Sequence, residues 1–548
     1  MPIAIHWSAR RWILTLVGLL WFCVLAWAML EMFTPHYRVS PATTFVTGPL
    51  NRDGTVNFAA AINAANSQGV APQDNAAVAL LKILGAHVLL GTAPARTAGL
   101  AAMGISKLPQ TGAFTSFSDY LMAADFGLPA HQPRPATAIE RMRLRYQMNA
   151  AINEHIYRYD NINKPWRPVE HPWVARWLKS QRRVIKMVRA AADLPRYFSP
   201  FLRSRNGMLI YLMPPANVEL LRDMLRMDAL EKMGTGKSAS AWRDIEAIRQ
   251  LGVLVRQQRP TLIDLLISLS GQAEADELIA KLAATGISSE HQLRAYLAES
   301  KKWPIAGGLR ASINFGDRLT ELNFIQGLFE HQNLIAARQH GFRGFIPLHF
   351  GQGMAQYNRW INQFVAALRP AAYAVRRRAI MNQTTRIIGE SPRGWRGILI
   401  RLNVLHDMLT QMMPDFSQAL RIEYAVRARQ ALSRVALALA AYSRKHGGYP
   451  VTLSRLVPHF FTVIPADPFT GRPLHYTADK AGYLLYSIGP NLRDDHGFRA
   501  PQTYPPNPDA PDDIAVHVHW HVVPQARPNG KSARLPAHSG QSRAESSK

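Results

Sequence analysis

The feature that most constrains the fold is a helical periodicity that runs almost without interruption from about residue 55 to residue 446. Apolar side chains recur every three or four positions, and short clusters of Gly, Pro and Asn break the repeats. No run of alternating apolar and polar residues in this region is long enough for a strand. The pattern predicts a mainly α protein, a helical bundle or array, and argues against an enzyme built on a parallel sheet.

Capping signals mark the ends of several expected helices. Residues 260–286 begin with Pro260 and are so apolar that we expect a helix buried in the bundle. Ser289 and Gln292 have the spacing of a capping box, which predicts the start of the next helix. Because 548 residues exceed what one core normally supports, two or more domains are expected.

The pattern changes after residue 446. A long helix ends at Gly447 and Gly448, which are residues that terminate helices. Two short alternating runs, 474–477 and 483–488, follow around a turn, and residues 514–523 supply a third. This order predicts a small α+β domain with one long helix and an antiparallel sheet.

Residues 12–30 carry no charged side chain and as a helix would span roughly 28 Å, the thickness of a bilayer core. Arg10 and Arg11 precede this segment, so the positive-inside rule places the N-terminus in the cytoplasm. We therefore expect a single-pass bacterial inner-membrane protein with its bulk in the periplasm. A cleaved signal peptide is the alternative.

Composition narrows the classes of partner. The net charge of +27 raises nucleic acid as a partner, but the arginines are scattered along the helices and form no single stripe, so nucleic acid is not expected. Contact with anionic lipid headgroups is the alternative for a tethered basic domain. Cys23 is the only cysteine, which excludes disulfides within the chain and thiolate metal sites in the rest of it.

The run GTGKS at residues 234–238 is similar to the end of a phosphate-binding loop. Such a loop needs an earlier glycine, where this chain has Glu231, and it follows a strand, where this chain has a helical pattern. The run is better explained as a glycine stop followed by a new helix, so no nucleotide is expected.

Two groups of side chains are candidates for metal binding. Residues 491–497 and 508–513 place several oxygen ligands on loops, which is the chemistry that calcium prefers, although acidic loops are often only solvated. His517, His519 and His521 alternate along the last expected strand and would share one face. Solvent-exposed histidines on an edge strand are the alternative.

From the long helix onward, the sequence carries GGYP, LSRLVP, IPADPFTGRPLHY, YLLYSIGP and a closing DDI in this order, over roughly residues 425–516. Together these elements resemble the C-terminal domain of the major pseudopilin of type II secretion systems. In that family the closing loop binds calcium, which the resemblance would assign to Asn491, Asp512 and Asp513, with Asp494 and Asp495 as further ligands. The expected Asp-Gly after GP is here Asn491-Leu492, and Cys23 stands where the family's peptidase motif has a glutamate.

Earlier in the chain stand the segments DGTVNFAAAIN, GVAPQDNAAVALLKILG, LLRDMLRMDALEKMGTGKSASAWRDIEAIRQLGVLV and PTLIDLLISL. With these segments, the layout of the whole chain resembles a set of uncharacterised bacterial membrane-anchored proteins with a helical array before this ending. The resemblance carries no activity. Hydropathy, helical periodicity and composition along the chain predict four parts. These are a cytoplasmic N-terminus and transmembrane helix (1–33), a helical periplasmic domain (34–415), a pseudopilin-like α+β domain (416–523) and a disordered basic tail (524–548).

The sequence favours a membrane-anchored scaffold or interaction protein over an enzyme. It holds no HExxH or GxSxG motif. Envelope proteins, including secretion or pilus components, are the expected partners. The alternative is a periplasmic enzyme whose site lies in the helical bundle, and carboxylates with shifted pKa values in a bundle cavity would favour it.

Overall fold

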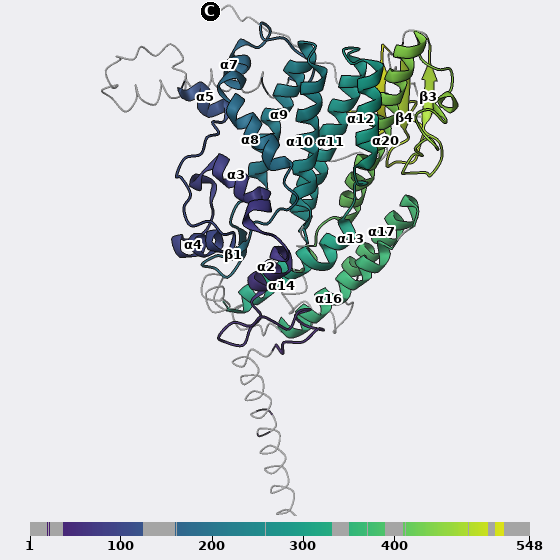
Figure 1. Ribbon diagram of the computed structural model, residues 1–548. Helices are drawn as coiled ribbons and strands as arrows, with labels where there is room; N and C mark the ends of the chain where they lie inside the picture. Colours follow the sequence, from purple (N-terminus) through teal and green to yellow (C-terminus); the bar gives the residue numbers. More distant parts are fainter. Residues whose placement is uncertain are drawn as a thin grey trace, which may run out of the picture.

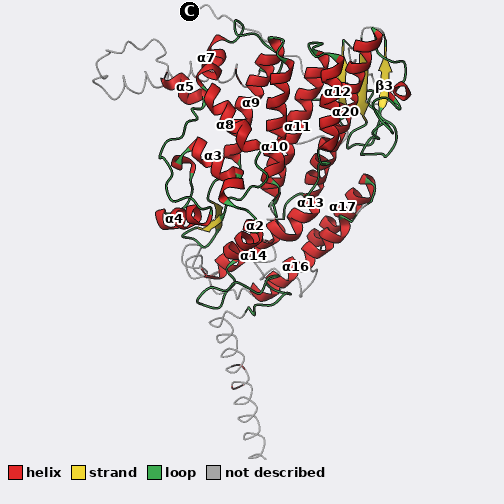
Figure 2. Cartoon of the chain, in the orientation of Figure 1, coloured by secondary structure: helices red, strands yellow, loops and turns green. Residues whose placement is uncertain are grey.

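Helices dominate the structure, a computed structural model, and its strands form two small antiparallel sheets (Figure 1, Figure 2). The mainly α class is therefore confirmed. The structure describes residues 19, 21, 37–123, 159, 162–257, 259–330, 350–369, 371–389, 409–411, 413–479, 482–501 and 510–519.

The described helices of more than one turn are α2 Phe58–Ser67, α3 Ala76–Leu84, α4 Ala93–Ala102, α5 Phe117–Ala123, α7 Pro172–Ser180, α8 Arg182–Ala192, α9 Ala216–Gly234, α10 Ser238–Val255, α11 Leu262–Ala284, α12 Glu290–Lys302, α14 Arg318–Glu330, α16 Phe350–Ala367, α17 Tyr373–Gly389 and α20 Phe416–His446. A π-helical segment, Ser312–Asp317, leads into α14. The strands are β1 Phe201–Arg203, β2 Leu209–Tyr211, β3 His475–Ala478, β4 Tyr483–Ser487 and β5 Ile514–Val518.

The long helices α9, α10, α11, α12 and α20 stand side by side as the centre of the molecule (Figure 1). Helix α10 packs between α9 and α11, and α20 packs against both α11 and α12. Helices α3 and α8 cover one side of this array, while α14, α16 and α17 lie below it in the view of Figure 1. The array holds the side chains that form the candidate site.

The C-terminal sheet packs directly on the array. Its order is β3-β4-β5, with both pairs antiparallel, and Tyr483 faces Ala478 on one side and Val518 on the other. Strands β4 and β5 contact α20, whose side chains are buried along most of its length. The predicted long helix, hairpin and third strand are confirmed, and the last strand ends at Val518.

Helix ends follow the capping signals. Ser289 and Gln292 make the predicted capping box at the start of α12, and Thr261 with Asp264 makes a second one at the start of α11. Gly447 ends α20 in the left-handed conformation at φ +76°. The apolar periodicity of residues 171–195 predicts one helix, but the structure has two, α7 and α8, which are separated at Gln181.

Arg249 and Asp276 are charged side chains inside the array that can be buried because they pair with each other. Arg249 on α10 lies 3.4 Å from Asp276 on α11, and Asp276 accepts a hydrogen bond of 3.0 Å from the Ser433 hydroxyl on α20. Burial raises the pKa of Asp276 to about 6, while Arg249 opposes the shift. One buried group therefore links three helices of the array.

The membrane assignment needs correction. The expected membrane helix, residues 12–30, falls outside the described residues apart from Leu19 and Trp21, and so does the tail, 524–548. Among the described residues, no helix combines the length and the apolar character needed to cross a membrane; α20, for example, includes four arginines in the run 421–434. This finding corrects the expectation of a single-pass inner-membrane protein in the periplasm, and with it the link to secretion or pilus machinery.

Candidate functional site

The glycine run at 234–238 is a turn between two helices, as predicted. Helix α9 ends at Gly234, Gly236 adopts φ +76°, and α10 begins at Ser238. The Ser238 hydroxyl is buried and hydrogen-bonds the hydroxyls of Ser288 (2.6 Å) and Tyr296 (3.1 Å). These contacts tie the turn to the start of α12, and they occupy the hydroxyl that a phosphate-binding loop would offer to a metal ion.

The structure brings together all five residues that the resemblance assigned to calcium. Asn491 donates through Nδ2 to Asp495 Oδ2 at 2.7 Å, and its backbone N–H donates to Asp512 Oδ1 at 3.2 Å. Asp513 Oδ2 accepts from the backbone N–H of Asp495 at 3.1 Å. Asp494 Oδ1 accepts from the Tyr486 hydroxyl at 3.0 Å. Two loops far apart in sequence are thus held together by carboxylates.

Asp513 is the member of this loop cluster that fits a cation. Its side chain is 1% exposed, and Oδ1 is buried with no hydrogen-bond partner in the described part of the chain. Burial raises its pKa to about 7, and repulsion from Asp495 and Asp494 adds to the shift. A hard cation such as Ca²⁺ would satisfy the free oxygen and relieve the repulsion.

The other members of the cluster are turned toward protein partners. Asp494 lies 3.5 Å from His475, and Asp512 lies 3.9 Å from Arg421. Across the described residues, no three His, Cys, Asp or Glu side chains are grouped so that they could hold a metal ion. A calcium ion here would therefore need backbone or amide oxygens beside Asp513 and Asp495.

The two described histidines of the group, His517 and His519, are not brought together as a metal site. His517 lies on β5, and His519 follows the end of the strand at φ +48°, which breaks the alternation that would put both on one face. His521 lies outside the described residues.

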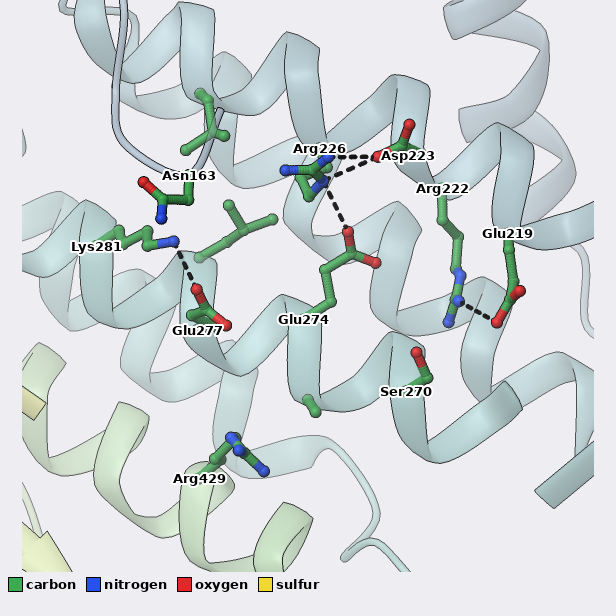
Figure 3. Close-up of a pocket in the computed structure, with 13 residues that line it drawn as sticks. Asn163, Glu219, Arg222, Asp223, Arg226, Ser270, Glu274, Glu277, Lys281 and Arg429 are labelled. Carbon is green, nitrogen blue, oxygen red and sulfur yellow. Dashed lines mark hydrogen bonds and ion pairs between the residues drawn. The ribbon is translucent and has the colours of Figure 1, made fainter. Parts of the chain in front are cut away.

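A polar cavity of about 510 Å³ lies between α9 and α11 (Figure 3). Its carboxylates are Glu219, Asp223, Glu274 and Glu277. Its cationic side chains are Arg222, Arg226, Lys281 and Arg429. Three helices supply them, because Arg429 comes from α20 and the others from α9 and α11.

Arg226 organises the centre of the cavity. Its Nε and Nη2 donate to Asp223 Oδ1 at 2.9 and 2.6 Å, and Nε lies 3.4 Å from Glu274 Oε1. Its Nη1 donates to the carbonyl oxygen of Ile162 at 2.7 Å. With most of its donors used, Arg226 holds the two carboxylates in place.

Glu274 is the carboxyl group in the cavity with a perturbed environment. Burial raises its pKa above the ordinary value, while Arg222 and Arg226 oppose the shift. Arg222 can lie close because Gly271 faces it: a Cβ at residue 271 would stand 2.0 Å from Arg222 Nη1. A buried carboxyl group with a raised pKa holds its proton more tightly than an exposed one, which favours proton exchange with a bound molecule.

The amino-acid sequence alone does not reveal this cavity. The residues at 219, 222, 223 and 226 repeat at helical spacing, and those at 274, 277 and 281 do the same. Each set resembles an ordinary charged helix face. Only the packing of α9 against α11 shows that the two faces meet.

Comparisons with protein-family models, with curated proteins and with solved structures find no match for this chain.

Proposed function

We propose that the protein is an interaction scaffold, in which the helical array and the pseudopilin-like C-terminal sheet hold a binding surface for another protein. The observation that carries the proposal is the outer face of α17. Met381 and Ile388 are 48% and 60% exposed there, seven residues apart and therefore on one side of the helix. Such apolar side chains, set among charged ones, are typical of a protein-binding surface.

The charge of α17 indicates the kind of partner. Arg377 and Arg378 accompany the two apolar side chains on this face, and the sequence of the helix contains no Asp or Glu. A different side of the helix, with Tyr373, Ile380 and Ile387, packs into the molecule. We expect a protein segment that combines acidic and apolar side chains.

The test compares variants of the full chain in affinity purification from the source cells. Met381→Glu with Ile388→Glu should remove a partner that the wild type retains, and rising salt should weaken that partner's binding because the arginines contribute to it. Val451→Glu with Val463→Glu is the matched control, since these side chains are 85% and 79% exposed in the C-terminal domain. If both variants recover the same proteins as the wild type, α17 is not the binding surface.

We also propose that the C-terminal loops bind calcium through Asp513 and Asp495, with Asn491, Asp494 and Asp512 shaping the loops. The support is the buried, unpartnered oxygen of Asp513. The ion would supply structural crosslinking between the two loops.

A second candidate function is an enzyme with its site in the helical bundle. The polar cavity between α9 and α11 favours it, because Glu274 has the raised pKa that a general acid or base needs.

A further inference from the structure

We infer that the cavity between α9 and α11 binds a small molecule with an oxyanion group, a carboxylate or a phosphate, which pairs with Arg429. The inference does not depend on the surface of α17, and it holds whether or not the bound molecule is chemically transformed.

Most of the charged side chains around the cavity are paired with one another. Arg226 is paired with Asp223 and Glu274, as described above. Arg222 Nη2 lies 3.3 Å from Glu219 Oε1, and Lys281 Nζ lies 2.6 Å from Glu277 Oε1. The carboxylates are therefore each committed to a cation other than Arg429.

Arg429 differs from the other cations of the cavity. Its side chain reaches from α20 toward the cavity, and Figure 3 draws no contact to it. In the part of the chain that the structure describes, Arg429 has no hydrogen bond and no ion pair, although its residue is half-buried. A guanidinium with five donors that has lost part of its hydration is most simply completed by an oxyanion, which it can bind through two parallel hydrogen bonds.

The electrostatic surroundings of Arg429 also favour an anion. Burial lowers the pKa of Arg429, and repulsion from Arg499 adds to the shift. Glu277 and Asp276 oppose it without forming a pair with Arg429. An anion bound at Arg429 would relieve this repulsion between the two arginines.

The rest of the cavity sets the size and polarity of the molecule. Its volume is within the range of small-molecule sites, and Leu230 and Leu278 contribute apolar walls. Asn163 and Ser270 add neutral groups that can donate and accept hydrogen bonds. We expect a compact polar molecule, with its oxyanion at Arg429 and hydroxyl or amide groups nearer Glu274.

The test is isothermal titration calorimetry on the full chain with inorganic phosphate and, separately, with succinate, both against chloride at equal ionic strength. The wild type should bind at least one of the two with a stoichiometry near one, and the comparison shows whether phosphate or carboxylate is preferred. Arg429→Gln should weaken that binding roughly ten- to hundredfold, because a charge-assisted pair is lost. Arg429→Lys should keep part of the affinity, since it retains the charge without the planar fork.

Arg243→Ala is the matched control, because Arg243 is an exposed guanidinium on α10 away from the cavity. It should bind the anion as the wild type does, and circular dichroism should show each variant folded. Absence of binding by the wild type, equal binding by Arg429→Gln, or an equal loss in Arg243→Ala would each overturn the inference. If Arg429→Gln fails to fold, Ser270→Leu supplies the test: it leaves Arg429 in place but puts a larger apolar side chain on the wall of the cavity, and it should weaken binding of the anion.

Discussion

At the scale of single residues, Asp513 is the most informative side chain. Its Oδ2 is held by the backbone N–H groups of Asp495 and Gly497, at 3.1 and 2.8 Å, while Oδ1 lacks a partner among the described residues. A buried acceptor without a partner costs stability, and more so when it is charged. The pKa of about 7 means that this cost increases as the group ionises.

The pH dependence of stability follows from the direction of this shift. The pKa of Asp513 is raised from 3.8 to about 7 in the folded protein, so between these values the folded state keeps a proton that the unfolded state has released. This contribution to stability is complete below pH 4 and is lost as the pH rises through 7. Asp513→Asn keeps an acceptor for the two backbone donors, and it should raise the melting temperature at pH 8 by roughly 2 to 4 °C without changing it at pH 4.

Adding calcium to the same experiment distinguishes the cost of the buried Asp513 carboxylate from its role as a calcium ligand. At pH 8 calcium should raise the melting temperature of the wild type and leave that of Asp513→Asn unchanged, because the ion needs the carboxylate. Asp479→Asn serves as control, since Asp479 lies in the β3–β4 turn and accepts from Gly482. An equal calcium response in all three proteins would exclude a site at Asp513.

At the scale of elements, the α9–α10 turn shows which residues of the GTGKS run matter. Gly234 lies where a Cβ would stand 2.1 Å from the carbonyl oxygen of Trp166. Lys237 is exposed, and its side chain forms no hydrogen bond with the described residues. The glycine is therefore required by packing, whereas the lysine is not.

We expect Gly234→Ala to lower the free energy of unfolding by about 1 to 3 kcal/mol, even though alanine favours helix over glycine. Lys237→Ala should change it by less than about 0.5 kcal/mol. Urea denaturation followed by circular dichroism measures both. A neutral Gly234→Ala would mean that the segment at Trp166 moves aside, and a costly Lys237→Ala would contradict the assignment of this run as a simple turn.

Local signals predicted the elements well where the chemistry is local. The capping box at Ser289 and the glycine end of α20 depend on residues within one turn, so their spacing is sufficient. The break at Gln181 and the hairpin of β1 and β2 were missed. The strands of that hairpin have three residues each, which is too short for an alternating pattern to be visible.

At the scale of the whole molecule, the two candidate sites differ in how far the sequence predicts them. The loop residues 491–495 and 512–513 could be named from a motif, although their mutual hydrogen bonds could not. The cavity could not be predicted without knowing how three helices pack. The position of Arg429 relative to α9 and α11 depends on contacts between residues far apart in sequence. Charged faces on separate helices carry no information about which of them meet.

Helix α20 makes one cooperative unit of the array and the C-terminal sheet. It packs on α11 and α12 on one side and on β4 and β5 on the other, and Ser433 joins its interior to Asp276. Neither part can leave without exposing buried side chains of α20 to water. The two parts should therefore unfold together, although the sequence divides them near residue 416.

Native-state hydrogen exchange across a urea series measures this coupling. The slowest amides of α11, α20 and β4 should share one free energy of opening and one dependence on urea, because a single transition exposes all three. Helix α17 is the internal control: it packs on α20 only in part and should open at lower urea. If β4 exchanged through an earlier transition while α11 and α20 stayed protected, the sheet would be a separately folding module, and α20 would belong to the array alone.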